Sequence, residues 1–136
     1  MKNLFKIDSQ GVLEIQASQA SVHTDFDFYI GKWSIRNRKL KDRLCASTEW
    51  LEFDSTDDTM HLLKGQANLN KFKAVLDGEE FEGLALRLFD PLSKLWSIYW
   101  ADSKGVKLDP PMIGSFEDNI GKFYCMDTCK GQRVLG

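Results

Sequence analysis

Residues 81–100 constrain the fold of this chain more than any other segment. They form two runs rich in aliphatic and aromatic residues, joined by a turn sequence at 90–94. Strand side chains point alternately to the two faces of a sheet, so the first run divides into two sets. These sets are Leu84, Leu86 and Leu88 on one face, and Ala85, Arg87 and Phe89 on the other. Pro91 has the fixed φ that suits the second position of a turn, and the segment therefore predicts a β-hairpin.

The same design recurs along the chain, and no long helical stripe interrupts it. The pattern predicts a loop at 65–70 and a hairpin turn at Asp77-Gly78. Regularly spaced short strands of this kind are typical of an all-β sandwich or an up-and-down barrel. The expected strands are 33–40, 47–53, 59–63, 72–76, 81–89, 95–101, 112–116 and 122–128.

The N-terminal part of the chain differs from this meander. Residues 1–20 are polar and weakly patterned, so we expect an N-terminal lead-in followed by a single β-barrel domain at 21–136. Residues 21–31 predict a short helical plug, because Thr24 or Asp25 can cap its start and Gly31 can end it in the left-handed conformation.

Charge and hydrophobicity exclude several classes of protein. The net charge of -2 argues against a nucleic-acid-binding surface. A local basic run at 32–43 is either a solvated strand edge or a site for an anion or an acidic partner. We find no apolar segment long enough for a signal peptide or a membrane span, and we expect a cytoplasmic protein without a membrane partner.

The cysteines are three in number, Cys45, Cys125 and Cys129. An odd count without a regular framework predicts free thiols rather than disulfides. Two thiols without further ligands nearby are a weak metal signal, so we expect neither a metal site nor a cofactor.

Several segments together resemble an uncharacterised bacterial family of the calycin type, related in architecture to lipocalins and fatty-acid-binding proteins. The matching segments are 25–33, 47–50, 86–91, 96–102 and 110–116. The resemblance implies an antiparallel barrel and brings no established catalytic residues with it. It also implies two further strands after Gly131, so we expect a barrel that is incomplete at its C-terminal end.

The candidate site residues are aromatic and charged side chains on the expected strands. Arg87 lies in an otherwise apolar strand, and a buried arginine needs a carboxylate, backbone carbonyls or an anionic ligand. Together with Arg38 and Glu49 it would form a ring that anchors a carboxylate or phosphate in the barrel. The alternative is a set of outward-facing ion pairs, each worth about 0–1 kcal/mol. Contact area for the ligand would come from Trp50, Trp96, Tyr99 and Trp100, whose alternative role is ordinary core packing.

These residues favour non-catalytic binding of a small, partly apolar ligand with an acidic head group in the barrel interior. One alternative is an isomerase or hydrolase that uses Asp102 or Asp109 as a base, although no catalytic triad or glycine-rich phosphate loop is present. Another is an interaction module that forms a homodimer through an open strand edge.

Overall fold

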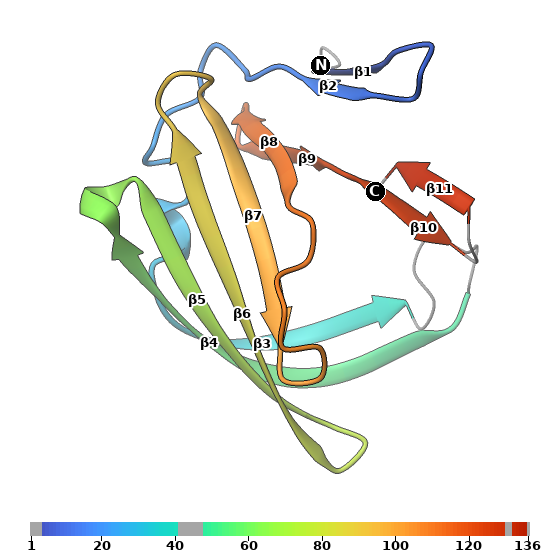
Figure 1. The fold of residues 1–136 in the computed structure, drawn as a ribbon. Coiled ribbons are helices and arrows are strands. Elements are labelled where there is room, and N and C mark those ends of the chain that lie inside the picture. Colours follow the sequence, from blue (N-terminus) through green and yellow to red (C-terminus); the bar gives the residue numbers. More distant parts are fainter. Residues whose placement is uncertain (1–3, 41–47, 130–131, 136) are drawn as a thin grey trace.

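The computed structural model describes residues 4–40, 48–129 and 132–135, and it confirms the predicted all-β fold. Its main element is a seven-stranded antiparallel sheet in which neighbouring strands follow the order of the sequence. The strands are β3 (Gly31–Leu40), β4 (Trp50–Leu62), β5 (Ala67–Leu76), β6 (Glu79–Asp90), β7 (Leu95–Asp102), β8 (Met112–Glu117) and β9 (Ile120–Tyr124). The sheet is strongly curved and forms a half-barrel (Figure 1).

Two small sheets lie beside this half-barrel (Figure 1). One pairs β1 (Phe5–Ile7) with β2 (Leu13–Ile15), and the other pairs β10 (Met126–Cys129) with β11 (Gln132–Leu135). Among the strands that the structure describes, β3 and β9 have only one neighbour each. The sheet is therefore open between these two strands.

The two faces of the sheet follow from the register. We call the face that carries Arg87 and Trp96 the inner face, since the Phe26 ring packs on it 4.9 Å from the Trp96 ring. Leu84, Leu86 and Leu88 belong to the outer face, as alternation predicted. The N-terminal lead-in contacts the outer face of β8 and β9. On β9 the Phe5 ring lies 4.6 Å from the Tyr124 ring.

The predicted short helical plug at 21–31 is not confirmed. Its hydrogen bonds join residues three apart, such as Asp25 N to Val22 O and Asp27 N to Thr24 O, and they form turns and a single 3-10 turn, η1 (Asp27–Tyr29). The Asp25 carboxylate accepts a hydrogen bond from Val22 N, three residues back, instead of capping a helix. The segment still fills the half-barrel, because Phe26 is buried against the inner face.

Two further predictions fail in β4 and β5. The expected strands 47–53 and 59–63 are joined in one continuous strand, β4, which runs through the polar residues 54–58. The expected loop at 65–70 is replaced from Ala67 onward by the start of β5, after a short 3-10 turn, η2 (Leu63–Gly65). Both errors concern polar segments that lie in the sheet. Within the described residues no helix is long and apolar enough to cross a membrane.

Candidate functional site

A cluster of buried polar side chains occupies the inner face of β4, β5 and β6. The register places Thr59 opposite Asn70, and the Thr59 hydroxyl donates a hydrogen bond of 2.8 Å to Asn70 Oδ1. Asn68 lies opposite Arg87, and Arg87 Nη1 donates to Asn68 Oδ1 at 2.9 Å. Buried polar groups need such partners, which explains why a polar sequence forms strands here.

The segment around η1 covers this cluster. The Tyr29 hydroxyl donates a short hydrogen bond to Asp57 Oδ2, and Asp57 is only 4% exposed. The Arg87 guanidinium lies 5.0 Å from the centre of the Phe26 ring and 5.1 Å from that of Tyr29. These contacts attach η1 and the residue before it to the sheet.

Burial changes the acid–base properties of the cluster. Burial, followed by the hydrogen bond and the charge of Asp57, raises the pKa of Tyr29 to about 12. Burial also lowers the pKa of Arg87, opposed by the nearby Tyr29 and Asp57. Two buried atoms, Asp57 Oδ1 and Arg87 Nε, have no hydrogen-bond partner among the described residues. The cluster therefore stabilises the covering segment while leaving one acceptor and one donor unused.

A second part of the inner face is aromatic. The Phe72 ring lies 6.5 Å from Phe53, 6.0 Å from Phe81 and 5.9 Å from Trp100. The Trp100 indole stacks on Phe81, and its Nε1 donates to Asp102 Oδ2 at 3.0 Å. This cluster forms an apolar surface at the end of the half-barrel away from η1.

A large groove opens beside the aromatic cluster, where two hairpins separate. β4 pairs with β5 only from Ser55 to Leu62, and beyond Ser55 the β3–β4 pair diverges from the β5–β6 pair (Figure 1). We call the space between them the split groove, and its volume is about 900 Å³. Its apolar lining consists of Ile35, Phe53, Ala74, Val75 and Phe81.

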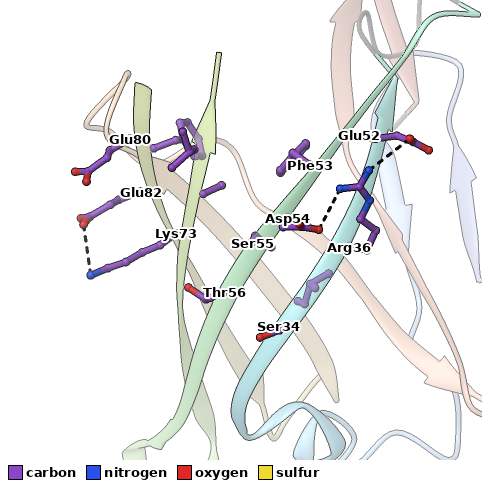
Figure 2. A pocket seen from close by; sticks show the side chains of 14 residues that line it. Ser34, Arg36, Glu52, Phe53, Asp54, Ser55, Thr56, Lys73, Glu80 and Glu82 are labelled. Atoms are coloured by element: carbon purple, nitrogen blue, oxygen red, sulfur yellow. Dashed lines mark hydrogen bonds and ion pairs between the residues drawn. The ribbon is translucent and has the colours of Figure 1, made fainter. Parts of the chain in front are cut away.

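The rim of the split groove is charged, with more acids than bases (Figure 2). Arg36 forms ion pairs with Glu52 at 3.6 Å and with Asp54 at 3.1 Å. On the other side Lys73 pairs with Glu82 at 3.7 Å, next to Glu80. Both rim cations thus already have carboxylate partners.

The structure brings together only some of the predicted site residues. Arg87, Trp96 and Trp100 share the inner face, but Trp96 is 1% exposed and packs against Phe26 as core. Tyr99 lies on the outer face.

The other predicted residues lie at the far end of β3 and β4. Arg38 stacks over the Trp50 ring at 4.3 Å on the outer face, and Glu49 is exposed just before β4 begins. Arg38 and Arg87 are therefore on opposite faces of the sheet, and the predicted ring of charges is not assembled.

Sequence reasoning missed the groove residues Phe53 and Phe81. Both are large apolar residues at the ends of alternating runs, which is a signal for burial. What the sequence does not display is the divergence of the two hairpins, and that divergence makes the groove.

The two candidate bases, Asp102 and Asp109, take part in hydrogen bonds that hold the local fold. The Asp102 carboxylate accepts hydrogen bonds from Gly105 N at 2.9 Å, Trp100 Nε1 at 3.0 Å and Lys104 N at 3.0 Å. The first two of these bonds are the main reason that the pKa of Asp102 lies below its usual range, which makes it a weaker proton acceptor. Asp109 is exposed, and its backbone N donates to Trp100 O at 2.8 Å.

In the described parts of the chain no group of three or more His, Cys, Asp or Glu side chains could hold a metal ion. Cys125 is half-buried. No family model, curated protein or solved structure matches this chain.

Proposed function

We propose that this protein binds a small, partly apolar ligand in the split groove without catalysing a reaction. The observation that carries the proposal is the groove itself, an open hollow of about 900 Å³ with phenyl rings and aliphatic side chains beneath a polar rim. Ligand sites are typically concave, mostly apolar and in this size range. The continuous aromatic contacts from Phe53 through Phe72 to Trp100 would extend the apolar surface.

The groove favours a ligand whose polar end is neutral. Four rim carboxylates, Glu52, Asp54, Glu80 and Glu82, face two cations, Arg36 and Lys73. A carboxylate placed there would meet more repulsion than attraction. The predicted anchor Arg87 does not line the groove, because Phe26 and Tyr29 lie against its guanidinium.

We also propose that the half-barrel is of the calycin type. Support comes from the seven-stranded meander in sequence order and from the 3-10 turn directly before β3. Trp33 adds to this, since its Nε1 donates to Tyr29 O at 2.8 Å and joins the first long strand to that turn. An experimental structure in which a C-terminal strand pairs with β3 would support the assignment, and a two-sheet sandwich would contradict it.

Binding can be tested by fluorescence titration with 1-aminoanthracene, a neutral aromatic probe. We expect one saturable site, and we expect Phe53→Ala to weaken it about tenfold, since a lost ring contact is worth on the order of 1–2 kcal/mol. Phe28→Ala is the matched control, because it also removes a partly exposed phenyl ring but lies outside the groove. Circular dichroism would verify that both variants fold. Absence of saturable binding, or equal losses in both variants, would contradict the proposal.

The second candidate is an interaction module that dimerises through an open edge. The observation that favours it is the edge of β3, which has no ladder partner on one side among the described strands. Exposed edges are templates for pairing with another chain. Native mass spectrometry would detect the dimer, and a monomer at every concentration would remove this candidate.

A further inference from the structure

A second hollow lies on the outer face, independent of the proposed groove function. It has a volume of about 520 Å³ and is formed by β5, β6 and β7 together with the connection from β7 to β8. Its floor and walls are largely aliphatic, with Leu84, Ala101, Val106 and Leu108. We call it the outer depression. The Lys73–Glu82 ion pair lines both hollows and stands between them.

Two lysines at the outer depression are without carboxylate partners. Neither Lys71 nor Lys107 has an ion pair within the described residues, although Asp58 lies opposite Lys71 in the register. Of the two acids that line the depression, Glu82 is paired with Lys73, whereas Asp102 accepts three hydrogen bonds from neutral N–H groups and keeps its charge. Two ammonium groups and one carboxylate at the depression thus lack an ion-pair partner, and this excess of positive charge beside an apolar surface would attract an anion.

The connection that walls the depression is held in a strained conformation. Val106 has φ of 52°, which is rare for a β-branched residue, and its side chain is 81% exposed. Backbone hydrogen bonds from Val106 N to Asp102 O and from Asp109 N to Trp100 O hold the connection in place. Strain of this kind gathers at ligand sites, where the surrounding structure maintains it. Here it keeps an aliphatic side chain at the edge of the hollow.

We propose that the outer depression binds a single aliphatic carboxylate. The hydrocarbon part would lie on Leu84, Ala101 and Leu108, and the carboxylate would lie at Lys71 and Lys107. A concave hollow between a sheet and a loop favours one amphipathic molecule over a flat membrane surface. This site differs from the split groove in its charge, because cations outnumber acids in its lining, whereas acids outnumber cations on the groove rim.

The test compares three probes with the same chain length: decanoate, decanol and decylammonium. Calorimetry would give the affinities, and amide chemical shifts of the full chain would locate each probe. We expect decanoate to bind at least about tenfold more tightly than decylammonium, with a preference that declines as salt is added. The shifts should include the amides of 84, 101 and 106–108.

Two double variants distinguish an effect of Lys71 and Lys107 from an effect of the protein's net charge. Lys71→Gln with Lys107→Gln should remove most of the preference for decanoate and leave decanol binding unchanged. Lys32→Gln with Lys39→Gln makes the same charge change on exposed positions of β3 and should leave the preference intact.

Several results would overturn the inference. These are equal affinity for decanoate and decanol, equal loss in the two double variants, or binding to anionic vesicles without binding to free decanoate. Decanol shifts confined to the split groove would contradict the outer site while supporting the proposed function.

Discussion

The β6–β7 and β4–β5 hairpins belong to the same sheet but place different chemistry on its inner face. From β6 and β7 the inner face receives mainly Ala85, Phe89, Trp96 and Trp100, with Arg87 as the exception. From β4 and β5 it receives the polar side chains Asp57, Thr59, Asn68 and Asn70 as well as the rings of Phe53 and Phe72. The first hairpin is held by aromatic packing, and the part of the second that lies beneath η1 is held by hydrogen bonds between buried side chains. In this protein, therefore, a strand can be buried on the inner face without being apolar in sequence.

The segment that covers the inner face is attached to both hairpins. The segment that precedes β3 contacts both regions, with the Phe26 ring against Trp96 and the Tyr29 hydroxyl on Asp57. His61 of β4 adds a contact of 3.6 Å to Asp27. Because the segment depends on both kinds of interaction, variants in either hairpin should affect its attachment.

The largest expected effect is in the aromatic region. Trp96→Ala should destabilise the fold by about 3–5 kcal/mol, because it opens a cavity beneath Phe26 and Phe89. The indole Nε1 has no hydrogen-bond partner in the described structure, so the loss measures packing alone. Urea unfolding followed by circular dichroism would give the value. A loss of less than about 1 kcal/mol would show that this residue is not core.

A smaller effect is expected at the contact between Gly83 and Trp100. A Cβ at position 83 would lie 2.2 Å from Trp100 Cη2, so Gly83→Ala must displace the indole from Phe81. We expect a cost of about 1–3 kcal/mol and a changed tryptophan emission. Gly105→Ala is the control, since its Cβ would meet nothing closer than 3.8 Å. An unchanged emission in Gly83→Ala would contradict the stacking.

The polar hairpin should respond to loss of a single hydroxyl. Thr59→Val keeps the side-chain shape and deprives Asn70 Oδ1 of its donor, at an expected cost of about 1–2 kcal/mol. Thr56→Val on the exposed outer face of β4 should cost almost nothing. If the two variants are equally stable, the buried hydrogen bonds do not hold this hairpin.

The smallest expected effect is a dependence on alkaline pH. The folded-state pKa of Tyr29, about 12, exceeds its ordinary value of 10.0, so the fold favours the protonated phenol. This contribution is complete below pH 10 and declines as the pH rises toward 12. Stability measured across this range should fall less steeply in Tyr29→Phe than in the unaltered protein. Parallel curves would show that the phenol titrates normally.

The hairpins that the sequence predicted correctly are those with conventional turns and alternation. Asp90 Oδ1 accepts from Leu92 N at 2.9 Å, and Asp77 and Gly78 both have positive φ, as their turn requires. It was harder to predict the face of the sheet on which each charged side chain lies. Side chains alternate between the faces, so an error of one residue in register moves a side chain to the other face, and Arg38 and Arg87 lie on opposite faces.

The polar segments could not be predicted from local pattern. Residues 54–58 and 67–70 contain residue types that favour turns, and only their partners across the sheet make them strands. The partner of Asp57 is Tyr29, which lies 28 positions away in the sequence. Such long-range pairs are absent from any short window of residues, and so is the divergence that opens the split groove.

The most direct test of the account is an amide chemical-shift titration of the full chain with 1-aminoanthracene. The account predicts saturable shifts at 34–36, 52–56, 73–75 and 80–82, the residues that line the split groove. Shifts that follow protein concentration instead, and that lie along β3 and β9, would contradict it and favour the dimer.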